Sequence, residues 1–476
     1  MVRDLKLFRD FLMLVGGQIG SRVLAFVAFA WLARKLEPAS YGAVEYVVGL
    51  SVFFALLVDG GLGVLGTRRY ARDPAERDLL AFQIPAARLM IALIGIPVMA
   101  GIAIMTMKQT VPAMLVWLFA LSLLSAPWRQ QWLFQATGRM SVVSLADIVR
   151  MTVFCLFILL TVRGTQDVLL VGWAEVAGIT AMTLYTLWMQ RRTFTASPLA
   201  RPFAGFGALL REGAAIGSTN LVWAFNQYIP LFLIAALVGG VPVAWFAGAS
   251  RIVVSVSQFS NVYHFNLYPS VTRAHAHSRE ALGLLLRRSM RLTAWGGMVC
   301  AALLSVFAEP IIALTLGSKL LGAAPLLCVM AWMIPVTLMS GHSRWGLAAA
   351  GAQARVLTSQ IAGGVVTVVA ILSLGAWLGV VGYALGALAG ALTVWAVSDY
   401  FAAKNECEPP SALIAGKPLI WSALLVGGAD YFALDTLERV MAAAAMLLII
   451  PLFDRKLIRE TMELGHSRMH RADTAG

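Results

Sequence analysis

Long apolar runs dominate the pattern of hydrophobic and polar positions along this chain. Each run holds roughly 17–25 residues, which is enough for a helix to cross a hydrocarbon core about 30 Å thick. The connections between the runs are short and polar. The pattern predicts an all-α chain with about fourteen transmembrane helices, near residues 11–34, 42–66, 80–105, 112–136, 141–162, 168–190, 213–238, 241–267, 289–308, 323–345, 355–378, 380–402, 418–436 and 438–453. The last two runs are short, so a count of twelve to fourteen fits the pattern.

The composition agrees with a polytopic membrane protein. Of the 476 residues, 59% are hydrophobic and only 13% are charged, and the mean hydropathy is +0.79. Most of the 37 lysines and arginines fall on the cytoplasmic side if the amino terminus is cytoplasmic, and the positive-inside rule selects that orientation. We therefore expect a multi-pass membrane protein with both termini in the cytoplasm.

Several classes of function are excluded by the same features. The net charge of +13 is mostly explained by topology, and no loop is long enough to form a basic face for nucleic acid. The four cysteines suggest neither a disulfide framework nor a metal site, and no glycine loop for binding phosphate is present. We therefore expect no metal, no cofactor and no enzymatic activity. Short outward loops also argue against a membrane polysaccharide polymerase or glycosyltransferase, which remains an alternative.

Arginines inside or at the edge of apolar runs are the most informative candidates. A guanidinium near a bilayer centre costs about 2.5–3.5 kcal/mol on insertion scales, so such residues normally face a protein interior or a watery cavity. Several in one chain indicate a cationic cavity within the membrane. The six are Arg22, Arg88, Arg129, Arg150, Arg251 and Arg344.

These arginines differ in the roles that the sequence allows. Arg129 and Arg344 lie close enough to the cytoplasmic ends of their runs to extend to the surface. Arg150 follows Asp147 by three residues on one helical face, so an intrahelical pair and a ligand-binding role are both open. Arg22, Arg88 and Arg251 are then the strongest candidates, and they come from both halves of the chain.

Polar residues near the arginines complete the predicted substrate-binding set. Arg251, Ser255 and Gln258 share one helical face, with Asn261 at its edge, and Gln18 lies one turn before Arg22. Such a stripe either lines a cavity or satisfies polar groups between packed helices. The whole set is Arg22, Arg88, Arg150, Arg251, Gln18, Ser255, Gln258 and Asn261. Two carboxylates inside apolar runs, Asp59 and Glu175, are weaker candidates for coupling to an ion.

A weak internal repeat divides the chain. Ile19-Gly-Ser21 recurs as Ile216-Gly-Ser218, as expected of two lobes in parallel orientation with a binding site between them. We expect an amino-terminal lobe of helices 1–6 over residues 1–196 and a carboxy-terminal lobe of helices 7–12 over 197–404. A final helix pair and cytoplasmic tail follow over 405–476. Glycines at every fourth position, Gly382, Gly386 and Gly390, predict a close helix-packing face.

Several longer motifs carry a family resemblance. Leu32-Ala-Arg-Lys-Leu-Glu-Pro-Ala-Ser-Tyr-Gly42 and Phe54-Ala-Leu-Leu-Val-Asp-Gly-Gly-Leu-Gly63 are followed by Leu133–Met140, Leu267–Arg273 and Leu378–Gly386. Their order and spacing, over nearly the whole chain to about residue 405, resemble the polysaccharide transporter family. Its members include the O-antigen flippases of the multidrug/oligosaccharidyl-lipid/polysaccharide (MOP) exporter superfamily.

The resemblance implies a fourteen-helix flippase that works by alternating access. It would move an undecaprenyl-diphosphate-linked oligosaccharide, the repeat unit of O-antigen, capsule or exopolysaccharide, from the inner to the outer leaflet of the bacterial cytoplasmic (inner) membrane. Polysaccharide polymerase machinery would be a further candidate partner, and the last helix pair would form a groove for the prenyl tail. Many relatives carry an aspartate in the middle of the seventh helix, where this chain reads Ala224-Phe-Asn-Gln-Tyr228. A drug or cation exporter of the same superfamily is the alternative transporter.

Overall fold

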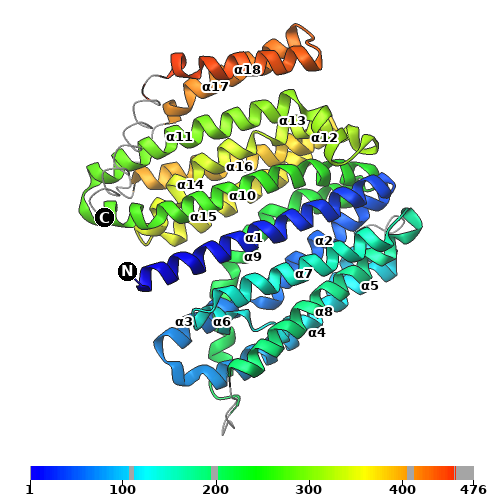
Figure 1. Ribbon diagram of the computed structural model, residues 1–476, viewed down its shortest axis with the longest axis vertical. Coiled ribbons are helices and arrows are strands. Elements are labelled where there is room, and N and C mark those ends of the chain that lie inside the picture. The colour runs from blue at the N-terminus through cyan, green and yellow to red at the C-terminus, as the bar shows by residue number, and fades with distance from the viewer. Residues whose placement is uncertain (1, 107–111, 195–201, 405–411, 455, 457–476) are drawn as a thin grey trace. The chain divides into compact units, whose positions relative to one another are not determined.

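Helices account for the regular structure of the described chain in a computed structural model (Figure 1). No strand occurs in the described ranges, which confirms the all-α prediction. The structure describes residues 2–106, 112–194, 202–404, 412–454 and 456. Side chains are described within those ranges except at 2–15, 261, 265, 269, 275, 279, 412, 413, 451 and 453.

Eleven helical segments of the described chain are long and apolar enough to cross a membrane. They coincide with predicted runs, which confirms the polytopic membrane architecture, whereas the count of about fourteen is not confirmed. The predicted run at 112–136 is broken: α5 (Ala113–Ser122) is followed by the 3-10 helix η2 (Leu123–Trp128) and by α6 (Gln131–Ala136). The two carboxy-terminal runs form the short helices α17 (Gly416–Tyr431) and α18 (Thr436–Phe453).

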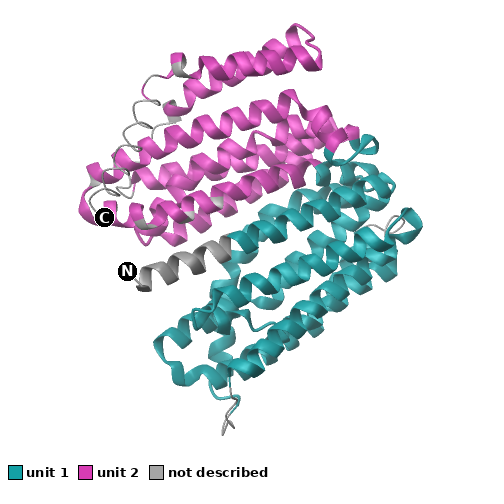
Figure 2. Cartoon of the chain, viewed as in Figure 1, with its two compact units in different colours: residues 1–248, 315–320 teal, residues 249–314, 321–476 magenta. Residues whose placement is uncertain are grey.

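The chain divides into two compact units (Figure 2), and the first contains residues 1–248 and 315–320. The first unit holds α5, η2, α6 and the start of α10 (Gly240–His277). Its other elements are α1 (Val2–Lys35), α2 (Pro38–Asp59), α3 (Leu62–Arg72), η1 (Pro74–Glu76), α4 (Arg77–Thr106), α7 (Met140–Thr161), η3 (Thr165–Asp167), α8 (Val168–Thr193) and α9 (Phe206–Leu237). Within it, α7 lies against both α1 and α8, and α2 lies against α4 and α9.

Glycines allow backbones in the first unit to approach closely. Gly60 and Gly61 end α2 with φ of 52° and 73°, a left-handed conformation that glycine adopts without a steric cost. A Cβ atom on Gly61 would lie 2.5 Å from the Gly217 nitrogen, and one on Gly217 would lie 2.6 Å from the Gly60 carbonyl carbon. The turn between α2 and α3 therefore packs directly on the backbone of α9.

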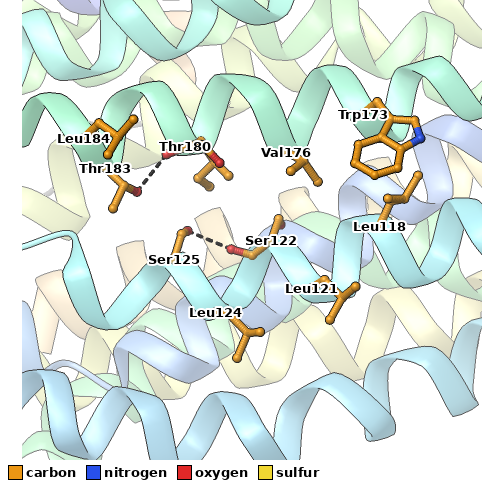
Figure 3. Close-up of a pocket in the computed structure, with 11 residues that line it drawn as sticks. Leu118, Leu121, Ser122, Leu124, Ser125, Trp173, Val176, Thr180, Thr183 and Leu184 are labelled. Carbon is orange, nitrogen blue, oxygen red and sulfur yellow. Dashed lines mark hydrogen bonds between the residues drawn. The ribbon is translucent and has the colours of Figure 1, made fainter.

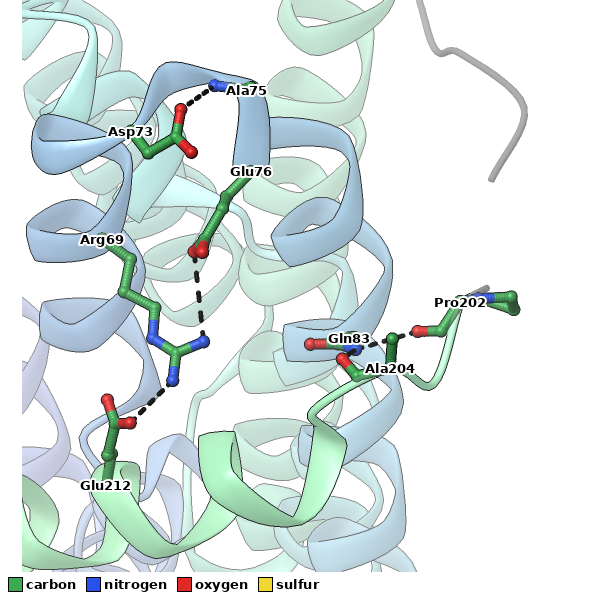
Figure 4. A network of polar contacts seen from close by, with 8 residues as sticks. All are labelled: Arg69, Asp73, Ala75, Glu76, Gln83, Pro202, Ala204 and Glu212. Carbon is green, nitrogen blue, oxygen red and sulfur yellow. Dashed lines mark hydrogen bonds and ion pairs between the residues drawn. The ribbon is translucent and has the colours of Figure 1, made fainter. Parts of the chain in front are cut away.

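The segment before α9 is held against α4 by one buried amide (Figure 4). Gln83 is only 1% exposed, and its Nε2 donates to the carbonyl oxygens of Pro202 and Ala204 at 2.9 and 2.8 Å. Nearby, the Arg69 guanidinium bonds to Glu212 on α9 at 2.8 Å. These contacts fix how the chain enters α9.

The second unit contains residues 249–314 and 321–476. It holds the remainder of α10 with α17, α18, α11 (Arg279–Val306), most of α12 (Ala308–Thr315), α13 (Ala324–Met330), α14 (Met333–Ala349), α15 (Gln353–Leu378) and α16 (Val380–Lys404). The 3-10 helix η4 (Ser318–Ala323) begins in the first unit. Helices α15 and α16 form an extensive contact, and α14 lies against both α11 and α16.

The predicted glycine face on α16 is confirmed as a helix contact. A Cβ atom on Gly386 would lie 2.7 Å from the Ile371 nitrogen, and one on Gly390 would lie 2.9 Å from the Gly363 carbonyl oxygen. A side chain on Gly382 would collide with the backbone at Leu374. The stripe therefore lets α16 lie directly on α15.

The helix pair α17 and α18 is fastened to α11 inside the second unit. Trp421 on α17 is fully buried, donates its indole N–H to the Met446 carbonyl oxygen at 2.8 Å and packs edge-on against Trp295 of α11. Ser422 donates to the Met298 carbonyl oxygen at 3.2 Å. The pair is therefore an integral part of this unit.

Candidate functional site

One ion pair in the first unit joins the end of α2 to the middle of α4. Asp59 is the last residue of α2, and its carboxylate, one third exposed, forms an ion pair with Arg88. The Arg88 side chain is only 7% exposed and also donates from Nη1 to the Arg129 carbonyl oxygen at 3.0 Å. The glycine turn that ends α2 thus sets the position of the carboxylate that holds Arg88.

A second pair joins α7 to α8. The Arg150 guanidinium bonds to Glu175 at 2.6 Å, and Glu175 is 7% exposed. The helices approach closely there, since a Cβ atom on Gly178 would lie 2.9 Å from the Arg150 carbonyl oxygen. The partner of Arg150 is therefore Glu175 on the neighbouring helix, whereas Asp147 accepts a hydrogen bond from Gln131 at 3.1 Å. The intrahelical pair that the sequence left open is not the one that forms.

Arg129 lies between these two pairs. It is within electrostatic range of Arg88, Arg150, Asp59 and Glu175. Its Nε is buried without a hydrogen-bond partner, and no carboxylate of the described chain forms an ion pair with it. The sequence predicts that Arg129 lies near the cytoplasmic end of its apolar run, and that depth stays a prediction; the structure places Arg129 directly after η2, beside the groups of both ion pairs. Arg129 is the residue of this site that sequence reasoning undervalued.

Gln18 and Arg22 lie on α1, which packs against α7. Both side chains are exposed, and Arg22 is within electrostatic range of Asp147 on α7. We call Arg22, Arg88, Arg129, Arg150, Asp59, Asp147 and Glu175 the arginine cluster. Its four guanidinium groups outnumber its three carboxylates, so with every group ionised it carries an excess positive charge and favours an anion.

The remaining predicted residues lie on α10 in the second unit. Arg251 and Gln258 are half-buried, and Ser255 is exposed and donates to the Arg251 carbonyl oxygen at 2.7 Å. Asn261 lies outside the residues whose side chains the structure describes. The structure thus groups the predicted residues of each unit separately, and a binding site formed by both stays a prediction.

A pocket of about 350 Å³ lies between α5, η2 and α8 (Figure 3). Its walls are mainly apolar, including Leu118, Leu121 and Trp173. The hydroxyls of Ser122, Ser125 and Thr183 bond to carbonyls of their own helical turns, and none of the arginine cluster lines it. The pocket therefore offers a hydrocarbon surface and no site for a charged ligand.

The fold defines the class of protein first. The chain is similar to the lipid II flippase MurJ in an inward closed conformation, with a TM-score of 0.74 at 13% identity over 94% of this chain and 100% of that one. It is also similar to an inward-facing MATE family transporter of the MOP superfamily, with a TM-score of 0.65 at 14% identity over 86% of this chain and 96% of that one. The chain therefore has the fold of these membrane transporters.

The family follows from the sequence. The model of the polysaccharide biosynthesis protein family matches residues 7–275, and this chain belongs to that family. A putative O-antigen transporter of Escherichia coli (strain K12) is 19% identical over 325 residues, which cover 66% of this chain and 76% of the relative. The resemblance inferred from the sequence motifs is thereby confirmed.

Proposed function

We propose that this chain is a flippase that moves an undecaprenyl-diphosphate-linked oligosaccharide from the cytoplasmic to the outer leaflet of the inner membrane. The observation that carries this proposal is the arginine cluster, with its excess of positive charge, inside a transporter fold. A diphosphate is a dense anion, and the planar guanidinium group binds phosphate oxygens through paired hydrogen bonds. An anionic cargo would therefore be stabilised beside this cluster.

The proposed roles of the arginines follow from their partners. Arg88 and Arg150 are each held by a carboxylate, so they would act as fixed positive groups. Arg129, without a counter-ion in the described chain, and Arg22, exposed on α1, would contact the diphosphate or acidic sugars directly. Arg251 with Ser255, Gln258 and Asn261 would supply contacts from the second unit, and Gln18 would add an amide.

Alternating access would let a single set of cationic groups serve both leaflets. In this cycle the diphosphate crosses the apolar interior only while it is paired with guanidinium groups, which removes most of the cost of transferring an ion into hydrocarbon. Coupling through Asp59 or Glu175 stays part of the proposal, as do cytoplasmic termini and a partnership with polysaccharide polymerase machinery.

A cation exporter of the same fold is the second candidate, because the likeness to the MATE transporter extends over 86% of this chain. An exporter of cations needs uncompensated carboxylates to hold its cargo, whereas Asp59 and Glu175 are each paired with an arginine. The charge balance of the cluster therefore favours the anionic cargo. A polymerase or glycosyltransferase would need catalytic groups on a sizeable outer loop.

The test is genetic and chemical. In cells that lack the chain, we expect lipid-linked oligosaccharide to accumulate on the cytoplasmic leaflet and surface polysaccharide to disappear. Arg22→Ala and Arg251→Ala should each fail to restore surface polysaccharide while the protein remains in the membrane. Arg163→Ala, an exposed arginine in the turn between α7 and α8, is the matched control and should restore it. Normal surface polysaccharide in cells carrying the Arg22→Ala/Arg251→Ala double variant would contradict the proposal.

A further inference from the structure

A buried polar chain in the second unit lies outside the predicted site. It runs from Tyr263 on α10 through Ser289 on α11 to His342 on α14. The Tyr263 hydroxyl lies 2.6 Å from Ser289 Oγ, and Ser289 Oγ lies 2.8 Å from His342 Nε2. Tyr263 is half-buried, Ser289 is 8% exposed and His342 is 1% exposed. The chain thus leads from a partly accessible phenol to a fully buried imidazole.

Neighbouring carbonyl groups fix the position of the proton on this imidazole. His342 Nδ1 lies 3.1 Å from the Leu338 carbonyl oxygen and 3.3 Å from that of Met339. A carbonyl only accepts hydrogen bonds, so Nδ1 must carry the proton and Nε2 is left as the basic nitrogen. In the neutral state Tyr263 donates to Ser289, and Ser289 donates to His342 Nε2.

The hydrogen-bonded series Tyr263–Ser289–His342 can accept one more proton without losing a hydrogen bond. A proton that reaches the Tyr263 oxygen allows the Tyr263 proton to pass to Ser289 and the Ser289 proton to pass to His342 Nε2. Afterwards Nε2–H donates to Ser289, Ser289 donates to Tyr263, and the phenol is again intact. Within these three residues three bonds to hydrogen form and two break, and the third bond that breaks is in the hydronium ion that delivers the proton, so the net change is one added proton. Hydroxyl groups permit this reversal because they both donate and accept.

A second ring limits the uptake to one proton. His264 on α10 is 1% exposed, and its ring lies edge-on to His342 with 4.9 Å between centroids. Its Nδ1 bonds to the Ser260 carbonyl oxygen at 2.7 Å, so Nε2 is its basic nitrogen too, but that atom is buried without a partner. A proton there would have no acceptor, and two adjacent imidazolium ions would repel each other.

Charged groups also lie near the pair. Arg344, on α14, is within electrostatic range of His264. Asp399, on α16, accepts a hydrogen bond from Ser343, the residue after His342. Gly341 leaves room for the His264 ring, which any side chain at that position would strike. The pair is thus held rigidly with one nitrogen prepared to be protonated.

We propose that His342 Nε2 is a proton-binding site of the second unit, supplied through Tyr263 and Ser289, and that this proton is coupled to transport. The coupling of this proton to transport rests on the proposed function, whereas the protonation of His342 does not. Taking up a charge at this buried position changes the electrostatic free energy of the unit, so a conformation that stabilises the imidazolium is favoured when the site is loaded.

Proton uptake by purified full-length protein tests the site without any substrate. We expect wild-type protein to bind more protons per chain than His342→Asn on acidification from pH 8 to pH 4. In [15N]histidine-labelled protein, the resonance missing from His342→Asn should be the one whose Nε2 becomes protonated. His277→Asn changes an exposed histidine at the end of α10 and is the control, which should leave the His342 resonance and its protonation unchanged. Identical uptake by wild type and His342→Asn, with no Nε2 protonation at His342, would overturn the site.

Tyr263→Phe tests the hydrogen-bond chain while keeping both rings. When His342 is neutral, the substitution has little effect on its stability, because Ser289 still donates to His342 Nε2. When His342 is protonated, the Ser289 hydroxyl has lost its acceptor on Tyr263. The proton affinity of His342 should therefore fall about fivefold, or about 0.7 pH unit. The midpoint of uptake therefore moves to lower pH. An unchanged midpoint, or one at higher pH, would refute the assigned direction of the bonds.

The amount of surface polysaccharide on cells tests separately whether protonation of His342 is coupled to transport. Cells with His342→Asn at normal protein levels should export less polysaccharide than cells with His277→Asn. Full export by His342→Asn, together with the loss of export in Arg22→Ala, would refute coupling at His342 and leave the flippase proposal intact. Full export in all of these variants would refute both the flippase role and the coupling, and the uptake measurement would still decide whether His342 binds a proton.

Discussion

Substituting Glu175 with glutamine tests how the arginine cluster is held together. The variant keeps the shape of the side chain but removes the negative charge, 2.6 Å from the Arg150 guanidinium. Breaking a buried ion pair by removing one partner costs about 3–5 kcal/mol, because a buried charge loses its compensation. Arg150 is 31% exposed, so we expect the lower end of that range, about 3 kcal/mol.

The assay is chemical denaturation of the purified protein in detergent, compared across a double-mutant cycle. Glu175→Gln should be destabilised strongly, and the double variant Glu175→Gln/Arg150→Met should recover much of the loss because no lone charge remains. The matched control is Glu212→Gln, which breaks the surface pair with Arg69, where the glutamate is 53% exposed. That change should cost less than about 1 kcal/mol. Equal stabilities of Glu175→Gln and Glu212→Gln would refute the claim that the pair on α7 and α8 is buried and structural.

Further predictions concern the packing of the first unit. Gly217→Ala should destabilise the protein by about 1–3 kcal/mol, because its Cβ atom would lie 2.6 Å from the backbone of Gly60. Gly20→Ala, the equivalent position of the sequence repeat, has no atom within 4 Å and should be nearly neutral; equal effects in thermal unfolding would contradict this packing. Gln83→Ala should cost about 1–3 kcal/mol, since two carbonyl oxygens before α9 lose their donor. Unchanged unfolding of Gln83→Ala would show that this contact does not hold the segment.

The helices were largely predictable because membrane crossing imposes one length and one composition on each. The prediction failed where local chemistry breaks a run. Residues 112–136 read as one apolar helix, but Pro127 lacks the N–H that would bond the carbonyl four residues earlier in an α-helix. After Trp128 the backbone leaves helical geometry, with ψ of 80° at Arg129 and 48° at Gln130. A hydropathy pattern averages over such a break and cannot locate it.

The candidate site was predictable in its residue types but not in its partners. Arginines inside apolar runs are visible in the sequence because their transfer cost is large. Which carboxylate neutralises Arg150 depends on how α7 and α8 pack, and the nearer residue in sequence, Asp147, bonds to Gln131 instead. The position of Arg129 beside the two ion pairs follows from the break after η2 and was hidden for the same reason.

The contact between His264 and His342 could not be predicted from the sequence, because the two residues are 78 positions apart on α10 and α14. Each occupies an ordinary helical position among apolar neighbours. Only the packing of α10 against α14 brings their rings to a centroid distance of 4.9 Å. Contacts of this kind are set by tertiary structure, so one sequence cannot reveal them.

The most direct test of the account is a flipping measurement with purified protein in liposomes. Lipid-linked oligosaccharide extracted from the producing cells is placed in the inner leaflet, and its arrival in the outer leaflet is followed with an added glycosidase that cannot cross the membrane. We predict cleavage that depends on the protein, falls sharply in Arg129→Ala and persists in Arg163→Ala. Oligosaccharide that stays protected in liposomes containing folded wild-type protein would contradict the account.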